Sequence, residues 1–429
     1  MSHMSAEFHP SYSDIQPRLG FAYQLDDKTV VRAGAGTNFD NWADYIQNGV
    51  SMRSYWPFGL TQGTSSDLNL YLQTVDAQHV VGPVGATPAA TPFPAGSRIN
   101  SSKFKNAYVT RWNLDVQRQF TKSLTLDLAY VGNKGLRGPS GFDQNIALTP
   151  GYGPIINRVP WPLAIIGAHG TRSLTSSWYN ALQLKAEERL SHGLSYLVAY
   201  TWSKSEDTGC SGFEGIEGCD IEQPNDIRND KSVSSFDLPF ILTTSVVYDL
   251  PFGKGRAYLN QKSVLGSIIG QWRSNVIFRS FSGQPLSLNA GSDFANIGNG
   301  GEERADPVPG VSPIPVNRTR LQWFNPAAFS EPPDCRLSTT TNCRYGYLGR
   351  NTLRGPGFYN FDFSVFRDFP ISDRLGIFQL RFEAFNLTNH TNFGVPNLNS
   401  AMSLNATPFA QITSAFQSRQ IQFAGKWEF

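Results

Sequence analysis

The sequence lacks both the high charge of a disordered chain and the long apolar runs of a helical membrane protein. Charged residues make up 16% of the 429 residues and hydrophobic residues 40%, which is enough apolar mass for a large folded domain. No window reaches the roughly 18 consecutive apolar residues that a membrane-spanning helix needs. A transmembrane barrel is not excluded by this absence, because its strands carry apolar residues only at alternate positions. Periodicity therefore has to decide the class.

An excess of charge of one sign is also absent. Lys and Arg number 36 against 34 Asp and Glu, a net charge of +2. Because no run or cluster of Lys and Arg could follow a phosphate backbone, nucleic acid is not an expected partner. The first residues, Met1 to Met4, have no charged region followed by an apolar one and do not form a secretion signal. We interpret residues 1–17 as a cloning remnant and a linker.

Catalytic and metal-binding motifs are missing as well. The sequence contains no G-x-S-x-G elbow, no H-E-x-x-H, no P-loop and no G-x-G-x-x-G after an expected strand. Its 6 histidines are scattered along the chain. We therefore assign no catalytic residue, metal ligand or cofactor and do not expect an enzyme. A hydrolase site would have to be assembled from distant loops.

Cysteine is scarce, and its spacing is informative. The 4 cysteines form two close pairs, Cys210 with Cys219 and Cys335 with Cys343, each within a stretch rich in polar and turn residues. Local pairs of this kind predict two disulfides in an oxidising compartment. The alternatives are a zinc site or free thiols. Neither pair has C-x-x-C spacing, and no histidine lies near either one.

The chain is rich in apolar residues that alternate with polar ones. Such period-two runs predict strands with one apolar face. They recur along the whole chain, with clear examples starting at Trp112, Leu124, Leu194, Phe240 and Phe378. The best helical candidate, residues 180–190, fits a strand at least as well and has no clear cap. The pattern predicts an all-β fold.

Short and long connections alternate between these strands. Short turns are expected at 26–27, 121–123, 191–193 and 371–373, and long polar segments at 40–107, 133–177, 204–234, 283–355 and 389–415. Soluble domains rarely have so many long connections. An antiparallel meander with tight periplasmic turns at one end and long extracellular loops at the other is typical of a transmembrane β-barrel.

The strand count predicts a partial barrel. We count about eleven to twelve strands between Arg18 and Phe429, with one intermediate connection, 251–270, on the side of the short turns. On this count strand one starts, and strand eleven finishes, on the periplasmic side. Complete bacterial barrels have an even number of strands, so strands are expected to be missing at the amino end. The open edges then need a cover, which self-closure, pairing of two copies or the missing strands would provide.

The last strand ends on an aromatic pattern. Ile421, Phe423, Trp427 and Phe429 share one face, with Gly425 between them, and polar residues occupy the other face. This pattern resembles the carboxy-terminal β-signal by which the barrel assembly machinery recognises outer-membrane proteins. The alternative is an ordinary edge strand that happens to end the sequence.

Seven segments spread over most of the chain carry a family resemblance. They are RWNLDVQR (111–118), YVGNKG (130–135), NALQL (180–184), YTWSKS (200–205), FDLP (236–239), LPFGKG (250–255) and RFEAFNLTNH (381–390). In this order they resemble TonB-dependent receptors, in particular the acidobacterial group with a carboxypeptidase-regulatory-like amino-terminal domain. The resemblance implies that residues 18–429 are the carboxy-terminal half of a barrel of about 22 strands in the bacterial outer membrane. The plug, the TonB-engaging segment and the first half of the barrel have no counterpart here, so TonB would be reached only through those parts.

In a membrane the apolar strand faces would contact lipid, and aromatic residues would mark the interfacial girdles. The residues expected there are Trp112, Tyr130, Tyr200, Trp202, Tyr248 and Trp272. The alternative for these faces is the core of a β-sandwich. The acidic loop 206–230 is expected to be a solvated external loop; a site for calcium or a cationic ligand is the alternative, although it has no D-x-D-x-D-G run.

Together these observations predict a receptor or transporter barrel for TonB-driven uptake of a nutrient ligand such as a siderophore, a glycan or a peptide. The expected partners are outer-membrane lipid, the barrel assembly machinery and that ligand. The alternatives are a smaller, self-closed porin-like channel and a soluble β-protein with hydrolase or carbohydrate-binding activity.

Overall fold

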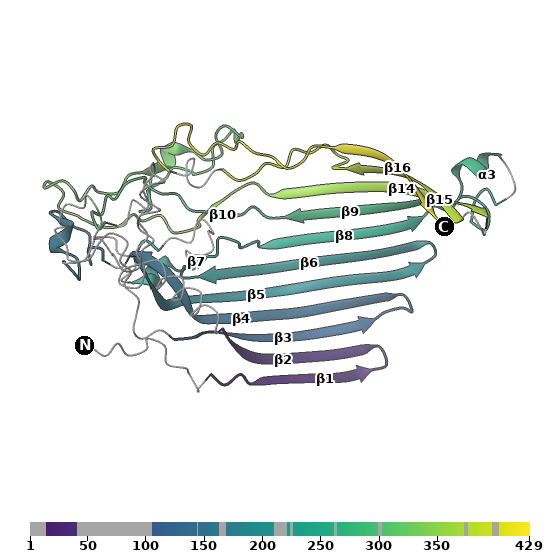
Figure 1. The fold of residues 1–429 in the computed structure, drawn as a ribbon, viewed down its shortest axis with the longest axis horizontal. Coiled ribbons are helices and arrows are strands. Elements are labelled where there is room, and N and C mark those ends of the chain that lie inside the picture. The colour runs from purple at the N-terminus through teal and green to yellow at the C-terminus, as the bar shows by residue number, and fades with distance from the viewer. Residues whose placement is uncertain are drawn as a thin grey trace, which may run out of the picture.

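A computed structural model describes residues 14–40, 105–143, 145–162, 169–209, 221–223, 226–260, 264–298, 303–372, 376–396 and 403–429. Their main feature is one antiparallel meander sheet (Figure 1). Its strands are β1 (Arg18–Asp26), β2 (Thr29–Asp40), β3 (Ala107–Gln119), β4 (Leu124–Asp143), β5 (His169–Ser191), β6 (Leu194–Asp207), β7 (Ser232–Val233), β8 (Phe240–Asp249), β9 (Arg273–Phe281), β14 (Phe358–Ser372), β15 (Gly376–Phe385) and β16 (Gln420–Glu428). Eleven of them are neighbours in chain order, and the short β7 pairs with β6.

This sheet confirms the predicted all-β meander, and the strands found among the described residues agree with the predicted eleven to twelve. β1 begins at Arg18, the position that the sequence predicts. Residues 180–190 lie inside β5 and form a strand. β4 and β5 are longer than predicted, because their hairpin continues through much of the expected loop 133–177. In the described part of the chain, no helix has the length and apolar character needed to cross a membrane.

The connections divide between two ends of the sheet (Figure 1). At the turn end, residues 27–28, 120–123 and 192–193 join β1 to β2, β3 to β4 and β5 to β6. The strands β2, β4, β6, β9 and β15 end at the opposite end, which we call the loop end. β1 therefore runs from the loop end to the turn end, as β16 does. The expectation that strand one starts on the side of the short turns is wrong, because an odd number of antiparallel strands makes the two outermost strands point the same way.

Strand register explains a glycine in the YVGNKG segment. Gly132 lies directly opposite Trp112 in the pairing of β3 with β4. The indole ring covers it so closely that a Cβ atom on Gly132 would lie 2.4 Å from the ring. Beyond this point the β4–β5 register shifts between Gly135 and Gly138, where Arg137 adopts a φ of +59°. Such a bulge bends the strand as it leaves the regular sheet.

The RFEAFNLTNH segment ends β15 in a compact turn. Asn386 and Asn389 have φ values of +49° and +50°, a conformation that asparagine tolerates better than most residues. The side chain of Asn386 accepts a hydrogen bond of 3.0 Å from the backbone of His390 and donates one of 2.8 Å to its carbonyl. The backbone N–H of Asn386 donates to Asp362 of β14 at 2.9 Å. These bonds fix the direction in which the chain leaves the sheet.

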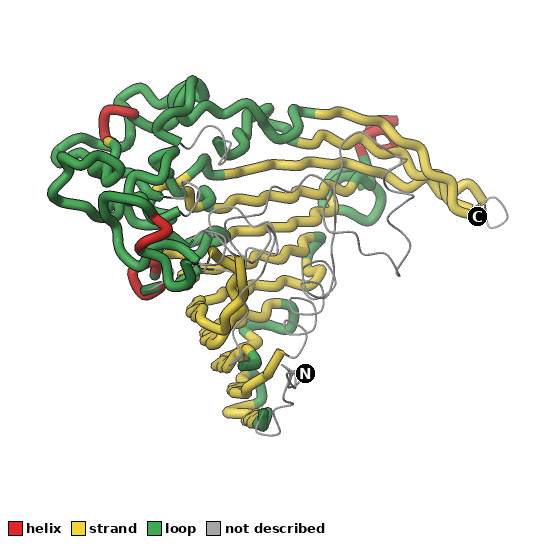
Figure 2. The backbone as a smooth tube through the Cα atoms, turned by 60° about the vertical axis from the view of Figure 1, so that its left-hand side comes forward, coloured by secondary structure: helices red, strands yellow, loops and turns green. Residues whose placement is uncertain are grey.

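At the loop end, long connections fold together into one body, which we call the loop cap (Figure 2). It consists of the described residues within 145–162, 221–239, 282–357 and 386–419. Its short elements are η1 (Ile155–Asn157), η2 (Ile227–Asp230), β10 (Pro285–Leu286), β11 (Asp306–Pro307), η3 (Pro326–Ala328), β12 (Phe329–Ser330) and β13 (Leu353–Arg354). One hydrophobic cluster contains Leu286, Leu288, Ala305, Phe324, Ala328, Phe329, Leu348, Leu353 and Ala410, and another contains Ile146, Ala147, Ala295 and Ile297. The hydrophobic core of the described chain therefore sits in its loops.

The sheet is curved and open among the described residues (Figure 2). Within these ranges β1 pairs only with β2, and β16 pairs only with β15. Each of these two strands therefore leaves one edge of backbone N–H and C=O groups unpaired. A further strand between residues 40 and 107, which self-closure would require, would fall in 41–104, outside the described residues.

The connection between β8 and β9 is the exception at the turn end, because it is long and contains a helix. This helix, α3 (Val264–Ile269), is not predicted by the alternating sequence pattern. Gly253 and Gly270 approach each other so closely that a Cβ atom on Gly270 would lie 2.8 Å from the Cα of Gly253. Trp272 Nε1 donates a hydrogen bond of 2.9 Å to the carbonyl of Ile268. These contacts fix α3 next to the start of β9.

Candidate functional site

Strand register gives the sheet an apolar face and a polar face. One row of paired residues on the apolar face consists of Ala33, Leu114, Tyr130, Leu182, Trp202 and Phe240. The neighbouring row on the polar face consists of Arg32, Asp115, Ala129, Gln183, Thr201 and Ile241. On the apolar face Leu114 is 49% exposed and Trp202 is 62% exposed. A β-sandwich is therefore the wrong interpretation, because a second sheet would cover such a face.

Five of the six aromatic residues predicted for the girdles belong to the apolar face. By register Trp112, Tyr130, Tyr200, Trp202 and Tyr248 all belong to this face. Tyr130 and Trp202 share a row towards the loop end, and the Tyr130 hydroxyl donates to Asn180 at 2.6 Å. Tyr248 and Trp272 lie at the turn end. Their role in an interfacial girdle stays a prediction.

Three of the four residues of the predicted β-signal lie on the apolar face by register. They are Ile421, Phe423 and Trp427, whereas the fourth, Phe429, lies beyond the paired residues. Phe423 packs against Phe382 of β15, with 5.2 Å between ring centroids, and Trp427 against Phe378 at 6.0 Å. Phe429 follows the end of β16 and is fully exposed. Recognition by the assembly machinery stays a prediction.

The polar face carries a series of ion pairs across β8, β9 and β14 to β16. Arg273 lies 3.0 Å from Asp249 and 3.9 Å from Asp368. Arg381 lies 3.3 Å from Glu383, which also accepts a hydrogen bond from Gln422 of β16. Because these pairs are partly exposed, they stabilise the fold little. Their contribution is a hydrophilic surface along one side of the sheet.

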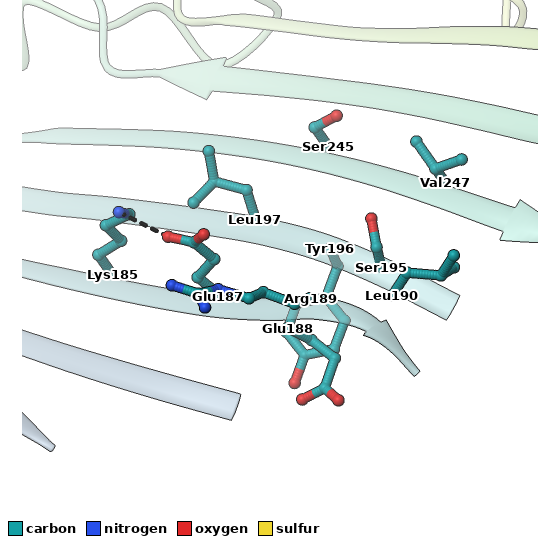
Figure 3. A pocket seen from close by; sticks show the side chains of 10 residues that line it. All are labelled: Lys185, Glu187, Glu188, Arg189, Leu190, Ser195, Tyr196, Leu197, Ser245 and Val247. Carbon is teal, nitrogen blue, oxygen red and sulfur yellow. Dashed lines mark ion pairs between the residues drawn. The ribbon is translucent and has the colours of Figure 1, made fainter. Parts of the chain in front are cut away.

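A pocket of about 440 Å³ lies on the polar face near the turn end (Figure 3). Lys185 and Glu187 of β5 form an ion pair of 2.8 Å there, and Arg189 lies beside it. Ser245 and Val247 of β8 line the opposite side. The charged groups of the pair are both close to half exposed, so the pocket offers no buried charge that would hold a ligand. We assign no function to it.

A second cleft, of about 500 Å³, lies where the polar face meets the loop cap, and we call it the aromatic cleft. Phe281 and Phe358 pair at the loop end of the polar face, and their rings stack at 4.6 Å. Phe416 of the loop cap meets Phe358 edge-on at 5.0 Å. The remaining lining residues are Phe236, Leu238, Gln284, Pro356, Phe393, Gly394, Val395 and Ser414. Apolar and aromatic walls with a few polar groups are typical of small-molecule sites.

The acidic loop 206–230 takes part in a buried ion-pair network inside the loop cap. Asp207 pairs with Arg350, which also donates to the carbonyl of Asp230 at 3.2 Å. Glu222 and Asp230 flank Arg304 at 2.6 and 2.7 Å. All of these side chains are buried. For these three acids the expectation of a solvated loop is wrong, because they are buried and paired with arginines. Glu214, Glu217 and Asp220 of the same loop lie outside the described residues.

The counter-charges come from the connection between β9 and β14. Its four arginines in the network are Arg304, Arg344, Arg350 and Arg354, and the last of them pairs with Asp237 at 2.5 Å. The partners are distant in sequence, by 74 residues for Arg304 with Asp230 and by 143 for Arg350 with Asp207. No spacing motif could have found them. Among the described residues, no group of three or more His, Cys, Asp or Glu is arranged to hold a metal ion.

Burial raises the pKa of two glutamates in the loop cap, Glu222 and Glu303. It raises the pKa of Glu222 to about 7, although the guanidinium of Arg304 acts in the opposite direction. It raises the pKa of Glu303 to about 8, even though Glu303 Oε2 accepts a hydrogen bond of 2.6 Å from the backbone of Ala295. The second oxygen, Oε1, is buried without a hydrogen-bond partner. Glu303 is therefore mostly protonated at neutral pH.

Cys335 and Cys343 are neighbours in the loop cap, and both thiols are free in the structure. Burial, together with the Cys343 thiol beside it, raises the pKa of Cys335 to about 12. The predicted bridge is therefore not formed here, although the thiols are close enough to interact. Its formation in an oxidising compartment stays a prediction, which alkylation with and without reductant tests. Cys210 and Cys219 lie outside the described residues.

The two histidines whose side chains are described make only local contacts. His192 sits in the turn between β5 and β6, with its Nδ1 3.0 Å from the hydroxyl of Ser191. His390 stacks on Tyr359 at 3.8 Å between centroids, and its Nδ1 lies 2.8 Å from the Tyr359 hydroxyl. Neither residue lines the aromatic cleft. The described residues therefore give no basis for assigning a catalytic centre.

Comparison with solved structures gives weak overall similarity to outer-membrane receptors. The ferripyoverdine receptor of Pseudomonas aeruginosa is 11% identical, with a TM-score of 0.45 over 96% of this chain and 33% of that one. BauA, the ferric preacinetobactin receptor from Acinetobacter baumannii, is 11% identical, with a TM-score of 0.45 over 96% and 36%. The outer membrane transporter YddB from Escherichia coli is 8% identical, with a TM-score of 0.46 over 95% and 39%. The chain thus spans well under half the length of each. No curated protein matches it by sequence.

A protein-family comparison identifies the class. The model described as outer membrane beta barrel domain matches residues 2–422, nearly the whole chain. In such a barrel the apolar face contacts lipid, the polar face lines the lumen, short turns are periplasmic and long loops extracellular. The protein is thus located in the bacterial outer membrane, and the alternative of a soluble β-protein is wrong. The chain belongs to the outer membrane beta barrel domain family.

Proposed function

We propose that this chain forms part of the barrel of a TonB-dependent receptor that takes up a nutrient ligand, such as a siderophore, a glycan or a peptide. The observation that carries the proposal is the loop cap. Its loops have their own hydrophobic clusters and are tied together by buried ion pairs such as Arg304 with Glu222. A passive channel has no need of so elaborate an extracellular body, whereas a receptor needs a fixed surface that recognises its ligand.

We place the contact with the ligand at the aromatic cleft. The cleft combines Phe281 and Phe358 of the polar face with Phe416 of the loop cap. A ligand with a planar or apolar part could stack on these rings, while Gln284 and Ser414 offer hydrogen bonds. From the cleft, the polar face provides a hydrophilic surface towards the periplasmic turns.

The direction of the outermost strands supports a place within a larger barrel. β1 and β16 both run towards the turn end, and within the described residues each has one unpaired edge. Direct pairing of β1 with β16, in one chain or between two copies inserted the same way, would put parallel strands into an antiparallel sheet. An odd number of further strands restores antiparallel pairing and gives an even total. We therefore favour residues 18–429 as the carboxy-terminal half of a receptor barrel over a self-closed channel or a homo-oligomer.

Uptake measurements test the proposal. Cells that carry the complete receptor containing this chain in their outer membrane are given isotopically labelled ferric siderophores, oligosaccharides and peptides, with and without a protonophore. We expect energised accumulation of one of these classes, lost with the protonophore and in cells without TonB. Flux that is unchanged by both treatments would instead establish the porin-like channel.

Substitution in the cleft tests the placement of the ligand. Phe416→Ala removes an aromatic wall that is 56% exposed, so folding is expected to persist while accumulation falls several-fold. Phe120→Ala is the matched control, since Phe120 is 50% exposed in the β3–β4 connection at the opposite end of the sheet. Equal accumulation in both variants would remove the cleft from the ligand's path without affecting the uptake proposal.

A further inference from the structure

The connection between β8 and β9 exposes an apolar helix at the turn end of the sheet (Figure 1). In α3 the apolar residues Val264, Leu265, Ile268 and Ile269 share one side, while Gly266 and Ser267 lie on the other. Val264 is 79% exposed, Leu265 58%, Ile268 61% and Ile269 39%. Most of the apolar surface of this helix is therefore left uncovered by the described chain.

Arg367 of β14 ties α3 to the lipid side of the sheet. By register Arg367 lies opposite Leu380, on the apolar face. Its guanidinium donates to the carbonyl of Ser267 and, at 3.2 Å, to that of Ile268, and it lies 4.5 Å from the ring centroid of Phe369. A cation on a lipid-facing surface is costly unless backbone carbonyls or similar groups satisfy it. The last turn of α3 supplies two carbonyls to Nη1 of Arg367, so we place the helix beside the apolar face and not on the lumen side.

We propose that α3 is an interfacial anchor whose apolar side inserts into the phospholipid of the periplasmic leaflet. The helix is bonded to Arg367 of the apolar face, at the end of the sheet where the periplasmic turns lie, and most of its apolar side chains are exposed. Trp272 is hydrogen-bonded to the carbonyl of Ile268, so its indole lies next to α3. Tryptophan is favoured at the level of the lipid headgroups. A short helix with one apolar side lies in the plane of the interface. This inference rests on the barrel family and is independent of the proposed uptake.

Photo-crosslinking in the outer membrane tests the anchor. The photoreactive residue p-benzoyl-L-phenylalanine replaces Val264 in one variant and Val316 in another; Val316 is a fully exposed valine of the loop cap. After irradiation, mass spectrometry identifies what is attached to each site. We expect a phospholipid adduct at Val264 in several-fold higher yield than at Val316.

Folding and alternative occupants are read in the same experiment. Only protein with the heat-modifiable gel mobility of a folded barrel is scored, and the same replacement at Leu265 serves if the Val264 variant does not fold. A protein adduct at α3 would show that another polypeptide covers the helix and would overturn the proposal. So would equal lipid yields at α3 and Val316, or no adduct at α3.

Discussion

Single buried arginines decide how firmly the loop cap holds together. Among the described residues Arg350 is the largest fully buried side chain, and it bonds to Asp207 and to the backbone of Asp230. Arg350→Met leaves the Asp207 carboxylate buried without its partner, which costs about 3–5 kcal/mol in comparable cases. We expect the free energy of opening of the cap, measured by native-state proteolysis of the detergent-solubilised protein, to fall by that order.

An exposed ion pair provides the control for this substitution. Arg228 pairs with Asp226 at 2.9 Å on the surface of the cap, with its side chain 87% exposed. Arg228→Met is therefore expected to leave the rate of cap proteolysis unchanged. If the two variants open equally easily, the buried network does not hold the loops together.

The protonation of Glu303 makes the stability of the cap depend on pH. Burial raises its pKa from 4.5 to about 8, so between these values the unfolded cap has lost a proton that the folded cap retains. The free energy of opening must then fall as pH rises through this window. Glu222, whose pKa is raised to about 7 by burial, acts in the same direction.

Glu303→Gln isolates this contribution, because it keeps the shape of the side chain and removes its titration. We expect similar cap stability in the variant and the parent near pH 5, and a shallower decline in the variant between pH 5 and 8, with the remaining slope due to Glu222. Measuring native-state proteolysis across this range checks the prediction. Parallel curves for the two proteins would mean that Glu303 is already ionised in the folded cap.

Packing between β3 and β4 depends on the absence of a side chain at one position. A Cβ atom on Gly132 would lie 2.4 Å from the Trp112 ring, whereas one on Gly20 in β1 would meet nothing within 4 Å. Gly132→Ala must displace the indole or the strand, an overpacking that typically costs about 1–3 kcal/mol. We expect this loss in urea unfolding from lipid vesicles, and no comparable loss for Gly20→Ala. Similar behaviour of both variants would show that Trp112 moves aside freely.

Local elements were predictable where the signal is itself local. The alternation in β3, β6 and β8 marks which residues face each side, and the turn at 192–193 is a short break between two such runs. α3 was not predicted, because a helix of six residues is too short to show a helical period that can be distinguished from the alternation of the neighbouring strands. The extension of β4 and β5 was not predicted, because the Gly and Pro residues in 133–143 are typical of a loop. The bulge after Gly135 nevertheless lets the hairpin continue.

The candidate site could not be predicted from the sequence, because its residues come from segments far apart in the chain. The aromatic cleft brings Phe236, Phe281, Phe358 and Phe416 together from separate segments. The acidic loop is matched by arginines that follow it by 74 to 143 residues. Such contacts depend on how the loops fold over the sheet. The sequence shows that the acidic and aromatic residues are present, but it does not show which of them come together. The register of the apolar face was predictable because it needs only neighbouring strands.

At the scale of the whole molecule, we propose that this sheet is part of a larger antiparallel barrel. β1 and β16 point the same way, and neither edge finds a partner among the described residues. In lipid, unpaired backbone groups cost several kcal/mol each, so these edges must be covered in the membrane. The polar face can enclose a complete lumen only when both of these edges are paired with further strands.

The most direct test is a cryo-EM structure of the protein in native outer-membrane fragments. We expect an even number of strands, with β1 and β16 each paired antiparallel to a strand outside the twelve of this sheet. A barrel in which β1 pairs in parallel with β16, within one chain or between two copies, would contradict it.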